Sequence, residues 1–335
     1  MELGLTTFAE MIAVGDAPAP SAGQRLCEVV EEAVATERAG LDVYGVGEHH
    51  RSDFAASSPA MVLSAIAART ERIQLTSAVT VLSSADPVRT YQDFATLDLI
   101  SNGRAELMAG RGSFIESFPL FGYDLADYDE LFTEKLALLL KIREEGPVSW
   151  SGRFRAPLTD AVIYPRTERP LPVWIAVGGT PESVARAGLL GLPLAIAIIG
   201  GQPARFKPLV DLYHRALEEG GHEQQPVAVH AHGYIADTDS QAVNDFYAPY
   251  AVAMSNIGRE RGWGPMTREQ FDSLRSQSGS LFVGTPDYVA EKIANVRDTL
   301  GLDRFMLHTS VGTLPHEKVL RNIELLGEKV APQVR

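Results

Sequence analysis

Short apolar runs alternate with longer amphipathic segments from the start of the chain. The apolar run at 2–8 is followed by an amphipathic stretch at 25–40 and by a second apolar run that ends near 49. This order is typical of a parallel sheet whose strands are joined by helices. The apolar runs predict strands near 2–8, 42–49, 73–82, 104–111, 173–178, 194–200, 227–235 and 304–310.

The boundaries of the intervening helices carry repeated signals. A capping residue followed by proline opens several of them, at Ser58-Pro59, Asp86-Pro87, Thr180-Pro181 and Thr285-Pro286. Glycine closes others, at Gly40, Gly103, Gly191 and Gly301. Eight strands with interleaved helices predict an α/β fold, a single (β/α)8 TIM barrel that forms one domain over 1–335. A doubly wound open sheet is the alternative, because a strand count taken from sequence can be off by one or two.

Two segments break this regular rhythm. The proline-rich segment 146–172 predicts an extended irregular insertion before strand 5. The segment 255–283 lies between strands 7 and 8 and is long for a barrel connection. Since long structureless loops are uncommon unless they are functional, we expect 255–283 to be a mobile lid over the barrel mouth. A surface excursion without a role is the alternative.

Composition and charge narrow the classes of function. The 335 residues include 43 acidic and 30 basic side chains, a net charge of −13, which disfavours a nucleic-acid partner. Cys27 is the only cysteine, so we expect neither an intramolecular disulfide nor a cysteine-based metal site, in keeping with a reducing cytoplasm. The N-terminus lacks a secretory pattern, and the densest apolar stretch, 189–199, is short and interrupted. These features predict a cytoplasmic protein that does not span a membrane.

The end of strand 2 is the first candidate for chemistry, because active sites of such barrels lie at the carboxyl ends of the strands. The strand ends in GVGEHH at 45–50. Side chains alternate along a strand, so His49 shares a direction with Gly45 and Gly47 and is expected to point into the barrel mouth. A structural histidine is the alternative. A metal site is not expected, because neighbouring residues on a strand diverge.

Three other strand ends offer groups that suit a phosphate. Arg111 lies between two glycines after strand 4, and its guanidinium can grip a phosphate, although an ordinary ion pair is the alternative. Strand 5 ends in Gly178, Gly179 and Thr180, where backbone N–H groups at a helix start favour an anion. Gly200 begins a second glycine loop after strand 6. No GxGxxG, GxxxxGK[ST] or GxSxG motif is present, which leaves a phosphate-bearing ligand held by a barrel.

At this point the sequence resembles bacterial-luciferase-like, flavin-dependent monooxygenases. The resemblance lies in EHHRSDF at 48–54, in the whole run at 76–125 and in the pattern GTPDYVAEKI…LGLDRF near the C-terminus. It implies an FMN-dependent barrel in which reduced flavin reacts with O2 to give a C4a-hydroperoxide. Such an intermediate decays in water, so the resemblance also implies a closed, apolar site.

The resemblance assigns roles to individual residues. His49 matches the family's active-site histidine, a general base or a stabiliser of the oxygenated flavin, and Glu48 matches a carboxylate near the flavin. The bond Ala78-Val79 aligns with a non-proline cis peptide that supports the isoalloxazine. The residues expected to bind the cofactor are Ala78, Val79, Arg111, Gly178, Gly179, Thr180, Ile198 and Gly200, with Phe8 near the flavin and Phe114 on the substrate side.

The chain also departs from the family. Where the luciferase α subunit has a second arginine downstream of Arg111, this chain carries Asp129, and Gly110 stands in place of a reactive cysteine. Light emission is therefore not implied. The segment 255–283 does not match the luciferase lid, so no residue is transferred to it.

Together these features favour an oxidoreductase, a monooxygenase that uses O2 and FMNH2 from a separate flavin reductase. It would oxygenate a small organic substrate by epoxidation, hydroxylation or Baeyer–Villiger oxidation. A deazaflavin-dependent dehydrogenase of the same fold and a non-catalytic partner subunit are the alternatives. A homodimer formed through the helices around strands 2 and 3 is expected from the resemblance.

Overall fold

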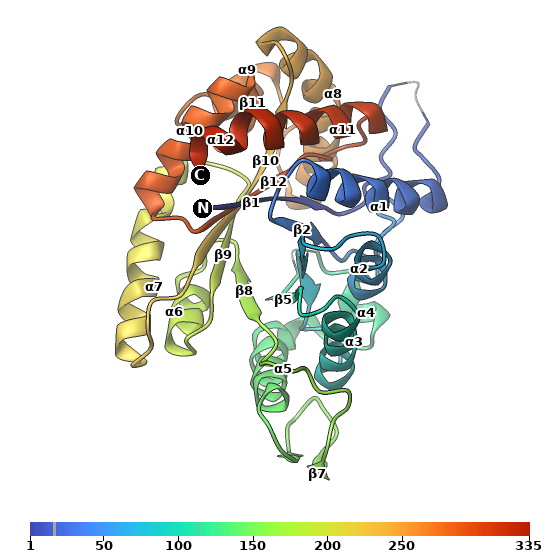
Figure 1. Cartoon of the computed structure of the whole chain (residues 1–335), viewed down its shortest axis with the longest axis vertical. Helices are drawn as coiled ribbons and strands as arrows, with labels where there is room; N and C mark the ends of the chain where they lie inside the picture. Colours follow the sequence, from blue (N-terminus) through green and yellow to red (C-terminus); the bar gives the residue numbers. More distant parts are fainter. Residues whose placement is uncertain (16–17, 113) are drawn as a thin grey trace.

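The computed structural model describes residues 1–15, 18–112 and 114–335. Within these ranges eight parallel strands form a closed barrel, and β10 pairs with both β9 and β12 to complete the circle (Figure 1). The barrel strands are β1 (Glu2–Thr7), β2 (Val43–Val46), β3 (Gln74–Ser77) continued by β4 (Thr80–Val81), β5 (Ala105–Gly110), β8 (Val173–Val177), β9 (Leu194–Ile198), β10 (Val227–Ile235) and β12 (Arg304–His308). The predicted barrel is confirmed, and the open sheet is excluded.

Helices surround the barrel and begin at the predicted proline-marked positions, although the side chains of Ser58 and Thr180 make no capping hydrogen bond within their helices. Asp86 and Thr285 accept hydrogen bonds from the first turns of their helices, and Gly301 ends its helix with a φ of 68°, a conformation that favours glycine. The surrounding helices are α1 (Ala22–Arg38), α2 (Pro59–Ala67), α3 (Pro87–Ile100), α5 (Tyr128–Arg143), α6 (Pro181–Leu189), α7 (Lys207–Glu219), α10 (Pro286–Leu300) and α11 (His316–Leu325). Over the described ranges, no helix has the length and apolar character that crossing a membrane requires.

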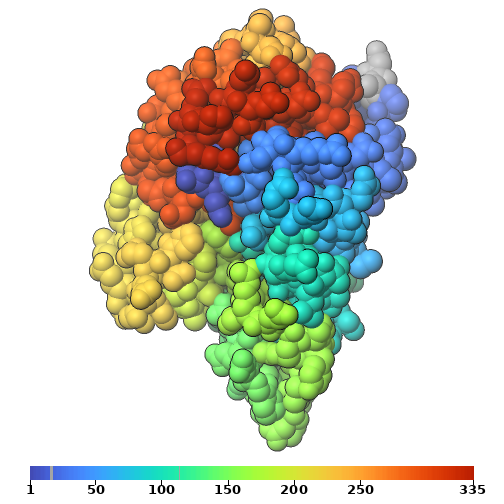
Figure 2. Space-filling view, viewed as in Figure 1, coloured from blue at the N-terminus to red at the C-terminus, as the bar shows by residue number. Residues whose placement is uncertain are grey.

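The insertion before β8 is more ordered than its proline content predicts. It contains an antiparallel hairpin of β6 (Val148–Trp150) and β7 (Leu158–Ala161), which projects away from the barrel (Figures 1 and 2). The Glu134 carboxylate on α5 accepts hydrogen bonds from three consecutive backbone N–H groups of the hairpin turn, those of Arg153, Phe154 and Arg155. This long-range anchor is absent from any local sequence pattern, so the predicted irregular loop was wrong over the hairpin.

The segment 255–283 is also more regular than expected. It begins within α8 (Asp239–Arg261), continues through α9 (Arg268–Arg275), and ends in β11 (Phe282–Gly284), which pairs with the carboxyl end of β10. Thr267 and Gln270 form a reciprocal capping box at the start of α9. The remaining short elements are α4 (Ser117–Leu120), α12 (Ala331–Val334), the 3₁₀ turns η1 (Leu125–Asp127) and η2 (Pro203–Phe206), and the π turn η3 (Leu326–Val330).

The amino-terminal half of the barrel interior is closed by packed side chains. The apolar plug consists of Val43, Met108, Trp174, Ala195, Ala228 and Met306. Next to this plug Arg304 donates two hydrogen bonds to Glu106, and its guanidinium lies 4.4 Å from the centre of the Trp174 ring. Because this end is filled, a ligand can enter the barrel only from the carboxyl ends of the strands.

Candidate functional site

A cavity of about 1220 Å³ opens at the carboxyl ends of the strands, where the sequence predicted the site. Strands from all around the barrel contribute to its lining, and α8 and α9 cover it. Most of the lining is apolar, with Phe8, Phe54, Phe114, Met254, Ile257 and Trp263 among its larger side chains. A cavity of this size and character suits a planar cofactor together with an apolar substrate.

His49 lies in the cavity wall, as predicted. Its ring is packed among three phenylalanines, with centroid distances of 4.3 Å to Phe54, 4.8 Å to Phe8 and 5.0 Å to Phe114. Its Nδ1 lies 3.8 Å from a carboxylate oxygen of Glu116. Burial acts to raise the pKa of Glu116, but its interactions with His49 bring that pKa below the usual value. The histidine therefore faces a carboxylate that stays ionised.

The glycines before His49 are required by space. A Cβ at Gly47 would lie 2.2 Å from the Phe8 ring, and one at Gly45 would lie 3.0 Å from the Cβ of Ala78. The strand-alternation argument that directed His49 inward is thus consistent with the packing. Gly110 is similarly confined, because a Cβ there would lie 2.6 Å from a methyl of Val79. Position 110 accordingly has little room for the family's reactive cysteine.

Glu48 lines the same cavity but is held by protein groups. One of its carboxylate oxygens lies 2.9 Å from Nε2 of His50, and the other accepts a hydrogen bond of 2.9 Å from the backbone N–H of Val81. Val81 follows the Ala78-Val79 peptide, which is cis as the resemblance implied. Glu48 thus fixes the backbone that carries the cis peptide, and both Ala78 and Val79 line the cavity.

Arg111 lies at the mouth of the cavity in an ion pair. Its Nη1 is 2.5 Å from the Asp129 carboxylate, its Nη2 donates to Thr180 Oγ1 at 3.3 Å, and its guanidinium lies 5.1 Å from the centre of the Tyr128 ring. The ion-pair alternative is thus present in the structure, and the binding of a phosphate by Arg111 stays a prediction. Asp129 is largely exposed, so a ligand phosphate can approach Arg111 in competition with it.

The start of α6 lies beside Arg111 and presents backbone donors. Thr180 occupies the N-cap position, yet its side chain makes no capping hydrogen bond within the helix. Gly179 has a φ of +116°, which favours glycine, and a Cβ on Gly178 would meet open space. The uncapped N–H groups and the positive end of the helix dipole together fit an anion.

A second arginine, Arg186, lies close to this corner, and no local sequence pattern indicates it. Burial and then the charge of Arg111 lower the pKa of Arg186 on α6. Its Nη1 is buried without a hydrogen-bond partner among the described residues. Arg186 does not line the cavity, so it adds positive charge behind the helix start and not a direct contact.

Of the two residues predicted to bind the cofactor at the end of β9, only Gly200 lines the cavity. Ile198 is fully buried in the hydrophobic core and does not line the cavity, whereas its neighbours Ala197 and Ile199 do. Ile198 is therefore not placed to contact a ligand in this cavity, although its two neighbours are. Gly200 lines the cavity, and a Cβ there would meet open space.

The segment 255–283 covers the cavity. Its lining residues are Asn256, Ile257, Arg261, Trp263, Gly264, Met266, Glu269, Gln270, Ser273 and Leu274. Glu260 at the end of α8 forms two hydrogen bonds with Arg51, which follows β2, and Arg51 also lies 4.7 Å from the centre of the Phe114 ring. An ion pair thus joins the cover to the loop that carries His49.

Sequence reasoning missed the inner end of the cavity. There Glu10, His230, His232, His308 and Tyr250 line the wall. The HAH run at 230–232 carried a usable signal, because period-two alternation in a barrel strand puts both histidines on one face. Glu10 and His308 are 298 residues apart, so no local pattern could pair them. Over the described chain, no group of three or more His, Cys, Asp or Glu side chains is arranged to hold a metal ion.

Comparisons with known proteins agree with this geometry. The model of the luciferase-like monooxygenase family matches residues 2–304. The F420-dependent glucose-6-phosphate dehydrogenase of Kineococcus radiotolerans is 31% identical over 284 residues, 82% of this chain and 76% of that one. The alkanal monooxygenase α chain of the Kryptophanaron alfredi symbiont is 28% identical over 207 residues, 61% of this chain and 57% of that one.

A solved structure extends the likeness to the whole fold. The oxygenating constituent of 3,6-diketocamphane monooxygenase from Pseudomonas putida, a type II Baeyer–Villiger monooxygenase in complex with FMN, superposes with a TM-score of 0.80 at 21% identity. The superposition covers 100% of this chain and 99% of that one. The family match points to an oxidoreductase. The chain belongs to the luciferase-like monooxygenase family.

Proposed function

We propose that this protein is an FMN- and O2-dependent monooxygenase that oxygenates a small, largely apolar organic substrate. The observation that carries the proposal is the joining, in one cavity, of an anion corner at Arg111 and Thr180 to an apolar interior that contains His49. The uncapped start of α6 fits the phosphate of FMN, and the wall around Ala78 and Val79 fits a flat ring.

FMN, when bound, would supply the redox chemistry and the activation of O2. The chain's own residues would supply the surroundings. His49, held by its phenylalanine neighbours and by Glu116, would hold or move a proton at Nε2. Glu48 would keep the cis-peptide backbone in place through Val81. The apolar cover would exclude water from the part of the cavity where the cofactor would react.

Reduced flavin and a second subunit complete the proposal. The chain has no nicotinamide motif, which supports delivery of FMNH2 by a separate flavin reductase in the cytoplasm. Exposed apolar side chains on α2 and α3, namely Met61, Leu99 and Ile100, support a homodimer through that face.

A deazaflavin-dependent dehydrogenase is the second candidate, favoured by the 31% identity to an F420-dependent relative. It would transfer hydride without O2, and it shares the strand-end glycines. A non-catalytic subunit is disfavoured because Glu48, His49 and Arg111 all line one cavity.

Paired binding and turnover measurements test the choice. The protein is titrated with FMN and with F420, and O2 consumption is then followed with FMNH2 and a panel of apolar ketones and alkenes under ¹⁸O2. We expect FMN to bind more tightly and ¹⁸O to enter a product. Preferential F420 binding with substrate oxidation under nitrogen would replace the proposal by the dehydrogenase.

A further inference from the structure

The inner end of the cavity carries a polar group of side chains that the proposed chemistry does not use. His230 and His232 lie on β10, His308 ends β12, Tyr250 lies on α8, and Glu10 follows β1. The ring centres of His230 and His232 lie 5.2 and 5.4 Å from that of His308, and the His232 ring lies 6.0 Å from Tyr250. All five side chains belong to residues that are at least nine-tenths buried.

Glu10 and His308 form the fixed part of this group. Nε2 of His308 lies 2.7 Å from one oxygen of Glu10, and Ser310 donates to the other at 2.8 Å. Nδ1 of His308 lies 3.1 Å from Thr6 Oγ1, so both ring nitrogens are engaged. Burial acts to raise the pKa of Glu10, but His308 and Ser310 bring it below the usual value. Glu10 is therefore a buried carboxylate whose oxygens are already used.

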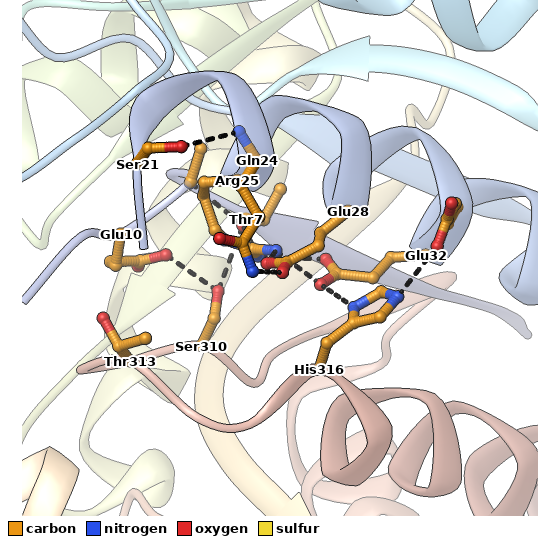
Figure 3. A network of polar contacts seen from close by, with 12 residues as sticks. Thr7, Glu10, Ser21, Gln24, Arg25, Glu28, Glu32, Ser310, Thr313 and His316 are labelled. Atoms are coloured by element: carbon orange, nitrogen blue, oxygen red, sulfur yellow. Dashed lines mark hydrogen bonds and ion pairs between the residues drawn. The ribbon is translucent and has the colours of Figure 1, made fainter. Parts of the chain in front are cut away.

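A chain of polar contacts holds this pair from behind (Figure 3). Ser310 contacts Thr7 at 3.0 Å, Thr7 accepts from Arg25 at 3.4 Å, and Arg25 is paired with Glu32 at 2.6 Å. His316, at the start of α11, lies 3.3 Å from Glu32 and closes the chain near the surface. These contacts fix the orientation of the inner wall, since each member is restrained by the next.

Three polar side-chain atoms in the same wall lack a hydrogen-bond partner among the described residues. Among the described residues, His230 Nε2, His232 Nδ1 and Tyr250 Oη are buried and have no hydrogen-bond partner. Buried polar atoms are nearly always partnered, so three orphans in one cavity wall point to a bound molecule. Burial and then His308 lower the pKa of His230 to about 3, and burial likewise lowers the pKa of His232. Both imidazoles are thus neutral at neutral pH, each with one donor and one acceptor.

We infer that this inner end, Glu10, His230, His232, Tyr250 and His308, is a subsite for an uncharged hydrogen-bonding oxygen, a hydroxyl or a ketone carbonyl, on an otherwise apolar substrate. A carboxylate or phosphate would add a second negative charge beside Glu10, and the two imidazoles with unpartnered ring nitrogens, His230 and His232, are neutral. A hydrocarbon would leave the three orphan atoms unpaired.

The subsite also orients the substrate. The Phe8 ring lies 4.3 Å from His308 and 4.8 Å from His49, so it separates the inner end from the outer histidine. A substrate anchored by its oxygen at the inner end extends its apolar part past Phe8 toward His49. The inference rests on the proposed function only for the identity of the reaction, and the binding site itself is independent of it.

Equilibrium dialysis with three matched probes tests the subsite. The probes are 2-naphthol, naphthalene and 2-naphthoate, applied to the FMN-saturated protein and to the variants Tyr250→Phe, His230→Phe and His214→Phe. His214 on α7 also has a buried nitrogen without a partner among the described residues, but it does not line the cavity. It is therefore a matched control.

We expect each cavity variant to weaken 2-naphthol binding about tenfold while naphthalene binding stays equal or tightens, because one neutral hydrogen bond is lost. The wild type should bind 2-naphthoate more weakly than 2-naphthol, and His214→Phe should change nothing. Tyr250→Phe removes only an oxygen and should not lower the unfolding temperature, whereas a structural hydroxyl would. Equal effects on naphthol and naphthalene, no effect on either, or no binding of any probe would overturn the inference.

Flavin fluorescence in the same samples separates this result from the proposed function. Loss of naphthol discrimination with tight FMN binding would remove the subsite and leave the monooxygenase proposal. A protein that fails to bind FMN in a titration but still prefers 2-naphthol to naphthalene would remove the monooxygenase proposal and leave the subsite.

Discussion

The two ends of the cavity are built on different physical principles. The outer end uses backbone: glycines after β8 and β9, an uncapped helix start, and one arginine whose charge is shared with an exposed aspartate. The inner end uses side chains: neutral histidines and a tyrosine around a buried carboxylate–histidine pair. The outer end therefore suits a highly charged ligand that reaches solvent, and the inner end suits a neutral one that is fully enclosed.

The largest expected effect lies between the two ends, at His49. His49→Ala removes the one imidazole that faces both the cavity and the ionised Glu116, so kcat for oxygenation should fall by about 100-fold or more. FMN affinity should be unchanged, because the ring of His49 packs among phenylalanines and is not part of the anion corner formed by Arg111 and Thr180. Steady-state kinetics and FMN titration check this, with His214→Ala as the control. Loss of folding in the variant, measured by circular dichroism, would leave His49 as a structural residue.

Arg111→Ala tests whether the outer end of the cavity binds the phosphate of FMN. Removing a charge-assisted contact to phosphate should raise the Kd for FMN by about 10–100-fold and leave kcat at saturating flavin largely intact. Fluorescence titration measures the Kd, and riboflavin, which lacks the phosphate, should bind both proteins equally. Arg153→Ala on the projecting hairpin is the control. An equal loss of riboflavin affinity would show that Arg111 supports the fold and not the phosphate.

Stability against pH distinguishes the inner end from the outer. Burial and His308 lower the pKa of His230 from 6.5 to about 3. Between these values His230 is protonated in the unfolded chain and neutral in the folded chain. The free energy of unfolding therefore falls as pH drops from about 6.5 toward 3. One such histidine adds about 1.4 kcal/mol per pH unit to that slope. Denaturant unfolding of His230→Phe should show a shallower slope; an unchanged slope would contradict the buried neutral state.

The smallest effect is expected at Asp129. Asp129→Asn removes the carboxylate that competes for Arg111, and the side chain is largely exposed, so FMN should bind only about two- to fivefold more tightly. The gain should shrink at high salt. Weaker FMN binding in Asp129→Asn would mean that the ion pair positions Arg111 for the phosphate.

The same contrast explains what the sequence could predict. The barrel followed from short apolar runs between amphipathic segments, proline-marked helix starts and glycine-marked ends, which are local signals. His49 was directed inward by its small neighbours, and Gly45 and Gly47 are indeed too crowded for a Cβ. The outer end was predictable for the same reason, because backbone sites leave glycines at strand ends.

The inner end was not predictable in this way. The Glu10–His308 pair joins the first and last barrel strands, and its orientation depends on Arg25 and Glu32 of α1. The hairpin at 148–161 depends on Glu134 of another element. Ile198 was misplaced because a strand end leaves the alternation of faces ambiguous by one residue. For the Glu10–His308 pair and for the hairpin, a contact between distant segments decides the outcome.

Anaerobic titration with FMNH2, followed by rapid mixing with O2, asks most directly whether this barrel holds reduced flavin for oxygenation. We expect one FMNH2 to bind per chain and to return to the oxidised spectrum more slowly than free FMNH2, because the cavity excludes water. Binding of reduced F420 but not of FMNH2, or reoxidation at the rate of free flavin, would contradict the monooxygenase proposal.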